Sequence, residues 1–432
     1  VEQIEEVFGG VEGFLENEAV QTALDEEAAR RGTSVYFPGR VVPMLPEALS
    51  NGVCSLRPNE DKLAFSCFME INKEGKVEDY SIEETIIHSN QRFTYQQAQD
   101  VLDGKDDTFK SELNTLAELA QRLLDKRFEE GSVNLDTPEP VFVLDDDGTP
   151  LDVVVKERLF THHLIEECML MANKTIAWHV ERLREKSKTK NNKDLFPFLY
   201  RIHDKPDLDK LLNVKENIQP LDIDFTVERN QVTARTLNYV LEQVKNTNVE
   251  VTINELILRA MAKAEYHPKN IGHFGLGFKY YTHFTSPIRR YPDVIVHRLI
   301  KNYKENIPSY PYKELEQIGE HSSERERSAI DAERDSVKLK QVEFLSNHIG
   351  DTFDGVVSGV MSKGLFVTLK QVHCEGMIGM HDLQDDYYVY DEKRHCLVGR
   401  HKKQEFRLGN DIRVRVVRTD TERRTIDFEP VS

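Results

Sequence analysis

The character of the chain changes at about residue 349, and this change limits the fold more than any other feature. From about residue 205 to 346 helical patterns dominate, and the last helix, roughly 311–346, is heavily charged. Short β runs with interspersed glycines follow, at 353–360, 365–369, 375–380 and 412–418. Several short strands in this length predict a small closed barrel of the oligonucleotide-binding type. We therefore expect an α+β protein in two parts.

The first half of the chain carries signals for hairpins and one long helix. A hairpin is predicted over 61–90, with its turn at 72–76, and a second over 140–155, turning at 145–148. Residues 32–39 predict a strand followed by a turn. A helix is expected over 158–185, where apolar residues recur at helical spacing and predict a core stripe. That stripe consists of Leu164, Cys168, Met171, Ala172 and Ile176.

Residues 281–293 concentrate rings, prolines and two adjacent arginines. Ser286 followed by Pro287 is typical of an N-cap and a first-turn proline, which places Arg289 and Arg290 at the positive end of a helix. Cations are unfavourable there unless an anion binds between them and the free N–H groups. One interpretation is a site for phosphates and stacked bases. The other is a helix start whose arginines pair with the many acidic residues.

The charge balance restricts the partners. A net charge of −18 argues against a broad basic surface for duplex DNA, but it allows basic residues to line a channel inside an acidic exterior. Five scattered cysteines without a CxxC pair indicate free thiols in a reducing cytoplasm. No apolar run approaches the length of a membrane-spanning helix, and the first residues lack a signal-peptide pattern. The aspartates at 145–147 indicate a solvated turn rather than a metal site.

Several motifs occur in an order and spacing that resemble one family. They lie at residues 32–38, 43–46, 49–56, 164–167, 201–206 and 281–293. Together they resemble the RNB (ribonuclease II) family, in particular its bacterial ribonuclease R-type members, and the terminal barrel resembles an S1 domain. The resemblance divides the chain into a divergent segment (1–21), an N-terminally incomplete RNB domain with a mixed sheet and many helices (22–348), and an S1 domain (349–432).

The resemblance implies a processive, hydrolytic 3′-to-5′ exoribonuclease. Single-stranded, and in some cases structured, RNA is degraded to nucleoside 5′-monophosphates with Mg²⁺ as the expected cofactor. The resemblance also implies a cytoplasmic monomer that binds neither DNA nor membranes.

Site residues follow from matching motif positions. Arg289 matches the arginine that contacts the phosphate under attack, and Glu333 matches an active-site glutamate near the RNA 3′ end. Tyr36 matches the ring that stacks on the terminal nucleotide. Tyr95 and Glu166 match positions that contact RNA and favour ribose. Taken singly, Tyr36 would indicate packing, Glu333 a solvated helix face, and Glu166 beside Glu167 a surface pair.

Three further RNA contacts are predicted. Arg290 adjoins Arg289, and Leu135 stands where relatives have an aromatic base clamp. Phe366 is a ring of the barrel, for which core packing is the alternative. The barrel also leans basic, through Lys393, Arg394, Arg400, Lys402, Lys403, Arg407, Arg413, Arg415 and Arg418.

The chain departs from the family at the metal site. Relatives carry a short aspartate run upstream of residues 23–28, but the 22 residues before that segment contain no aspartate, and the cold-shock domains are absent. Glu12, Glu16 and Glu18 lack the spacing of a built site, so no metal ligand is predicted. The chain is then a fragment, an engineered deletion, or a homologue that lost catalysis and kept binding to single-stranded RNA. The last is the alternative function.

Overall fold

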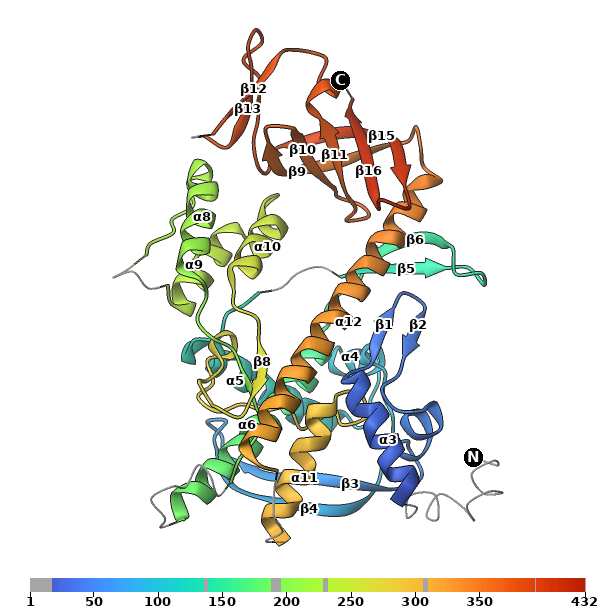
Figure 1. The fold of residues 1–432 in the computed structure, drawn as a ribbon, viewed down its shortest axis with the longest axis vertical. Helices are drawn as coiled ribbons and strands as arrows, with labels where there is room; N and C mark the ends of the chain where they lie inside the picture. Colours follow the sequence, from blue (N-terminus) through green and yellow to red (C-terminus); the bar gives the residue numbers. More distant parts are fainter. Residues whose placement is uncertain are drawn as a thin grey trace.

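The computed structural model describes residues 18–135, 139–187, 196–227, 232–305, 310–392 and 394–431. A helix-rich body lies at one end and a β-barrel at the other, and the long helix α12 (Tyr312–Ser346) runs from the body to the barrel (Figure 1). The expected α+β class is confirmed. The elements of the body are α3 (Glu18–Arg31), β1 (Val35–Phe37), β2 (Arg40–Val42), β3 (Asp61–Ile71), β4 (Val77–His88), α4 (Tyr95–Leu102), α5 (Lys110–Glu130), β5 (Pro140–Leu144), β6 (Pro150–Val155), α6 (Phe160–Lys186), β7 (Tyr200–Ile202), α8 (Leu208–Ile218), α9 (Ala234–Val244), α10 (Glu250–Ala260), β8 (Glu265–His267) and α11 (Tyr291–Glu305).

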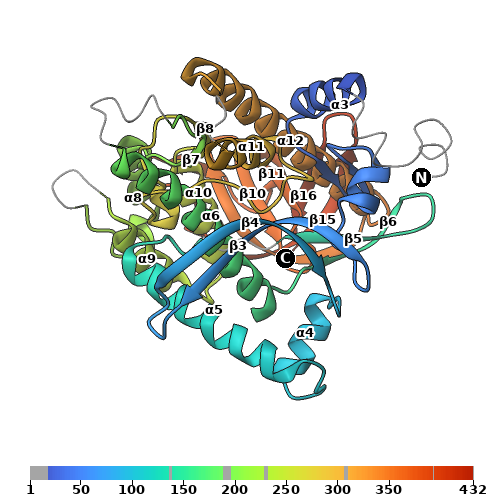
Figure 2. The ribbon, with the colours of Figure 1, turned by 90° about the horizontal axis from the view of Figure 1, so that it is seen from below.

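The strands of the body form hairpins instead of one extended sheet. Within the described ranges, β1–β2, β3–β4, β5–β6 and β7–β8 are separate antiparallel pairs, so the expected mixed sheet is divided. The long β3–β4 hairpin lies along the bottom of the body (Figures 1 and 2), and Phe65 and Ile82 on its inner face join the core around α6 and α11. Both predicted hairpins and their turns are confirmed.

Helix α6 confirms the helix expected over 158–185, but its buried stripe differs in part from the prediction. Leu164 and Ile176 are buried as expected, whereas Cys168, Met171 and Ala172 are only half-buried. Because α6 is covered from more than one side, polar side chains with partners are also enclosed. The remaining buried positions are Thr161, Glu167, Leu170, Asn173, Thr175, Ala177 and Val180.

The predicted terminal barrel is confirmed. Its strands β9 (Thr352–Met361), β10 (Gly364–Leu369), β11 (Glu375–Gly379), β15 (Asp411–Asp420) and β16 (Thr425–Pro430) close in the order β10-β11-β16-β15-β9. Val342 and Leu345 of α12 enter its core and attach it to the body. The sequence did not predict the antiparallel sheet of β12 (Tyr388–Asp391), β13 (Cys396–Gly399) and β14 (Glu405–Phe406), because these strands are short.

Gly319 sets the approach of α12 to β8. A Cβ at this position would lie 2.4 Å from the carbonyl oxygen of Tyr266. Strand β8 is also tied to α12, since the Tyr266 N–H donates to Ser323 Oγ at 2.9 Å. We expect Gly319→Ala to lower the free energy of unfolding by about 1–3 kcal/mol through overpacking, although alanine favours helices by about 1 kcal/mol.

Thermal unfolding checks this prediction. Gly52→Ala is the matched control, because Gly52 lies in the short helix η1 (Ala48–Val53) and a Cβ there would meet nothing within 4 Å. An unfolding temperature of Gly319→Ala equal to or above that of the wild type would contradict the steric argument.

Candidate nucleic-acid site

Residues 281–290 form an irregular segment that leads into α11, and the predicted helix start within it is wrong. Helix α11 begins at Tyr291, so Ser286 and Pro287 lie outside it. The N–H groups of Arg289 and Arg290 instead donate to the carbonyl oxygen of Ser286 and close a turn. The cause is Asp293, whose Oδ1 accepts the Ser286 N–H at 2.7 Å and folds the segment back before the helix starts.

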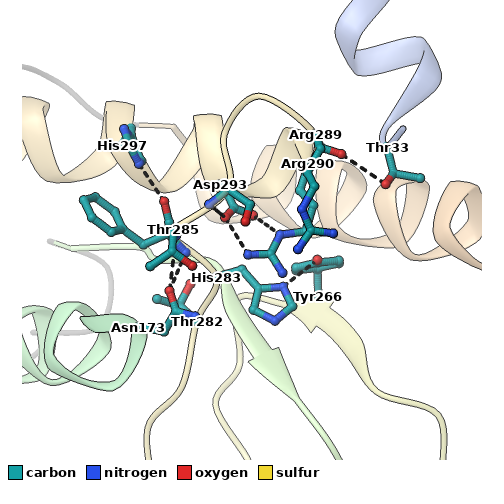
Figure 3. Close-up of polar contacts among 12 residues, drawn as sticks. Thr33, Asn173, Tyr266, Thr282, His283, Thr285, Arg289, Arg290, Asp293 and His297 are labelled. Atoms are coloured by element: carbon teal, nitrogen blue, oxygen red, sulfur yellow. Dashed lines mark hydrogen bonds and ion pairs between the residues drawn. The ribbon is translucent and has the colours of Figure 1, made fainter. Parts of the chain in front are cut away.

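Arg290 is held by an internal ion pair. Its Nε and Nη2 donate to the two carboxylate oxygens of Asp293 at 2.9 and 2.8 Å (Figure 3). Asp293 is 0% exposed, and such paired geometry is the one that stabilises a buried carboxylate. The Arg290 guanidinium is therefore engaged within the protein, and its predicted RNA contact gains no support from this geometry.

Arg289 has the opposite environment. Its side chain is exposed, while its carbonyl oxygen accepts the Ser34 N–H at 3.0 Å and the Thr33 hydroxyl at 3.1 Å (Figure 3). No hydrogen bond or ion pair to its guanidinium is found in the described part of the chain. A fixed backbone with an unpaired guanidinium leaves the planar fork of Arg289 free for bidentate hydrogen bonds to an anion.

Tyr36 and Glu333 contact each other next to the residues that hold the Arg289 backbone. Glu333, on α12, accepts the Tyr36 N–H at 2.7 Å through Oε1, and the Tyr36 side chain is 47% exposed. Residues Thr33 and Ser34, just before β1, thus contact the backbone of Arg289. Tyr36, the second residue of β1, contacts Glu333 on α12. The structure brings together Arg289, Tyr36 and Glu333, which are far apart in the sequence.

Tyr95 and Glu166 form a second group on α4 and α6. The Tyr95 ring stacks on His162, with centroids 3.9 Å apart, and Glu166 lies one helical turn beyond His162. Arg158 donates to Glu166. Glu167 is not the surface partner of Glu166, because it is buried and pairs with Arg127 at 2.7 Å.

Leu135 and Phe366 have packing roles in the structure. Leu135 is half-buried against the core of α8, α9 and α10, and the Asn134 N–H beside it donates to Asn238 Oδ1. Phe366 is half-buried and covers Gly359 on the neighbouring strand. Their predicted RNA contacts stay predictions.

Four of the arginines that gave the barrel its predicted excess of basic residues form ion pairs with neighbouring carboxylates. Arg394 and Arg407 both pair with Glu405, while Arg415 pairs with Glu429 and Arg418 with Asp427. Lys393 lies outside the described residues. Sequence reasoning overlooked these partners, because all except the Arg407–Glu405 pair lie 9 or more positions apart in the chain.

Uncharged imidazoles surround the arginine segment. Burial, together with Arg290 and Arg201 nearby, lowers the pKa of His283 well below its usual value, and the Tyr266 hydroxyl bonds to its Nδ1 at 2.8 Å (Figure 3). Burial, with His203 and Arg201, also lowers the pKa of His273 to about 3. The structure thus avoids further positive charge beside Arg290.

These imidazoles predict acid sensitivity. In the unfolded chain they take up protons near pH 6.5, whereas in the folded protein His273 stays neutral down to about pH 3. Below pH 6.5 the unfolded state therefore binds more protons, and the free energy of unfolding falls as pH decreases. We expect His273→Gln to show a shallower fall in urea unfolding experiments over this range. Identical slopes for wild type and variant would contradict the assignment.

The described residues contain no cluster of metal-ligating side chains. Mg²⁺ needs octahedral oxygen coordination and is usually anchored by one or two carboxylates. Within the described ranges, no three His, Cys, Asp or Glu side chains are grouped so that they can hold a metal ion. Glu12, Glu16 and the side chain of Glu18 lie outside those ranges. No reaction step is therefore assigned through a metal.

Comparison with known proteins decides the family. The model of the RNB domain matches residues 14–306. The chain belongs to the RNB family. The model of the S1 RNA binding domain matches residues 347–429 of this RNB protein. The resemblance inferred from the motifs is thereby confirmed, while the predicted domain boundaries stay predictions.

Named relatives agree with this assignment. Ribonuclease R of Aquifex aeolicus is 38% identical over 423 residues, which cover 94% of this chain and 57% of that protein. Ribonuclease R 1 of Lactococcus lactis is 36% identical over 417 residues, covering 94% of this chain and 50% of that protein. The chain thus spans about half the length of the curated relatives it matches.

A solved structure shares the fold of this RNB protein. Mycoplasma genitalium RNase R in complex with ribose-methylated single-stranded RNA superposes with a TM-score of 0.85 at 27% identity, covering 94% of this chain and 64% of that one. Among the described residues, no helix is both long and apolar enough to cross a membrane.

Proposed function

We propose that this chain binds the 3′ end of single-stranded RNA and forms the strand-holding part of a processive 3′-to-5′ exoribonuclease that releases nucleoside 5′-monophosphates. Arg289 binds the phosphate of the last linkage, Tyr36 stacks on the terminal base, and Glu333 fixes the strand that carries Tyr36. The observation that carries the proposal is the junction of these three residues, in which Arg289 and Tyr36 are exposed.

The chemistry of each group suits its role. A guanidinium binds a phosphate through two parallel hydrogen bonds and stabilises charge that develops on the oxygens. A tyrosine ring accepts any base by stacking, which suits an enzyme that shortens RNA of varied sequence. Tyr95 and Glu166 lie apart from this junction, on α4 and α6, where we propose that they contact the ribose of a more distant nucleotide.

Mg²⁺ is the proposed cofactor and would supply an activated water when bound, whereas the described residues hold and orient the strand. The described cysteines are free thiols, which supports a reducing cytoplasmic location.

The alternative is a protein that binds single-stranded RNA without cleaving it. The ribonuclease R relatives do not favour this alternative, but it is open to a direct test. Incubation with a 5′-labelled single-stranded oligoribonucleotide and Mg²⁺ separates the two. Stepwise shortening from the 3′ end supports the exoribonuclease. A salt-sensitive complex with intact RNA supports the binding protein, and no complex at low salt refutes both.

A further inference from the structure

The amide of Asn173, in the middle of α6, is buried with 2% exposure, and among the described residues its hydrogen bonds go to the arginine segment, residues 281–290. Its Oδ1 accepts the N–H groups of Phe284 and Thr285 at 2.9 and 3.3 Å. Its Nδ2 donates to the hydroxyl of Tyr281 at 3.3 Å, which fixes the orientation of the amide. Figure 3 shows Asn173 directed at this backbone from the α6 side.

These bonds matter because residues 281–286 belong to no helix or strand. A buried segment without regular structure must satisfy its N–H groups through side chains. Three consecutive N–H groups, 284 to 286, are accepted by Asn173 and Asp293, which come from two different helices. On the other side, His297 Nε2 bonds to the Phe284 carbonyl oxygen at 2.8 Å. The turn that ends in Arg289 starts from this fixed backbone.

We propose that Asn173 is a positioning residue for Arg289, and the part of this proposal that concerns phosphate rests on the proposed function. By holding two successive N–H groups, Asn173 sets where the turn at Ser286 begins and therefore where the Arg289 guanidinium lies. Misplacement of a binding group by 1 Å can cost on the order of 10²-fold in rate. Because Asn173 lies behind the segment and is buried, it acts without touching RNA.

A purely structural role for Asn173 is the competing explanation, and the variants are chosen against it. Asn173→Leu keeps the branching at Cγ but removes the acceptor. Asn173→Asp keeps an acceptor for both N–H groups. Thr175→Val is the matched control, because Thr175 is buried on the same helix but its hydroxyl contacts Met69 instead of the arginine segment. Asn173→Ser, with a hydroxyl too short to reach both N–H groups, replaces the leucine variant if that variant does not fold.

The first measurement is amide hydrogen exchange and needs no RNA. We expect Asn173→Leu to accelerate amide exchange within residues 281–290 by about tenfold or more. Each loss of about 1.4 kcal/mol in local stability raises the exchange rate about tenfold. Asn173→Asp and Thr175→Val should leave this segment close to wild type. Unchanged exchange in Asn173→Leu overturns the proposal.

The second measurement is binding of a single-stranded oligoribonucleotide over a salt series. The slope of log K against log salt is negative, and loss of one phosphate contact makes it shallower by about 0.7 for single strands. We expect Asn173→Leu to show part or all of this change, and Asn173→Leu/Arg289→Ala to bind no more weakly than Arg289→Ala alone.

Additive losses, or weaker binding with an unchanged slope, show a purely structural role and overturn the proposal. If the wild-type chain binds no RNA, the proposed function fails, and hydrogen exchange alone then decides the role of Asn173.

Discussion

Arg289→Ala is expected to weaken binding of single-stranded RNA by about 10- to 150-fold, the equivalent of one hydrogen-bonded charge contact of about 1.5–3 kcal/mol. The reason is that the Arg289 guanidinium is exposed and has no partner among the described side chains, while its backbone is fixed by Thr33 and Ser34. The slope of log K against log salt should become shallower by about 0.7, because one phosphate contact is lost. Fluorescence anisotropy with a labelled oligoribonucleotide measures both quantities.

Arg289→Lys separates charge from geometry. Lysine keeps the positive charge but loses the planar fork, so the salt slope should stay near wild type. If the chain shortens RNA, the rate should drop by about 10²-fold, far more than the affinity. Arg30→Lys is a control on the exposed face of α3, where Arg30 pairs with Glu27. Equal losses of rate and affinity in Arg289→Lys would argue against transition-state stabilisation by this residue.

Asp293→Ala is expected to lower the free energy of unfolding by about 3–5 kcal/mol, because it leaves the charge of Arg290 buried without its partner. It also removes the acceptor of the Ser286 N–H, so the arginine segment loses its link to α11. Urea unfolding followed by circular dichroism at neutral pH measures the change. The control is Glu84→Ala, which removes an exposed pair with Lys301 and should cost about 1 kcal/mol or less.

A double replacement tests whether charge burial is the cause. Arg290→Met in the Asp293→Ala background removes the unpaired guanidinium, and we expect it to recover part of the lost stability. The recovery should be incomplete, since the Ser286 N–H remains without its acceptor. If the double variant is less stable than Asp293→Ala, the loss has another origin than the isolated charge.

The local elements of this protein were predictable from short stretches of sequence. The turns at 72–76 and 145–148 predicted two hairpins, and the spacing of Leu164 and Ile176 predicted α6. The change at about residue 349 predicted the barrel. Each signal depends on residues within a few positions of one another, whose turn preferences and apolar periodicity act locally.

The buried polar positions were not predictable in this way. Glu167 lies beside Glu166 and reads as a surface residue, yet its partner Arg127 lies 40 positions earlier. Asn173 interrupts an apolar stripe and became interpretable only with residues 284 and 285 beside it. The partners that make such burial affordable are distant in sequence, so no local pattern contains them.

The sequence by itself determined the two hairpins, the helix α6, the barrel and the segment that carries two adjacent arginines. Only the tertiary structure decided which arginine is available for a ligand. Asp293 on α11 pairs with Arg290, three positions before it, whereas the backbone of Arg289 is held by Thr33, 256 positions away. Neighbouring residues share the same local preferences, but the folded segment directs the Arg290 guanidinium at Asp293 and leaves the Arg289 guanidinium exposed to solvent.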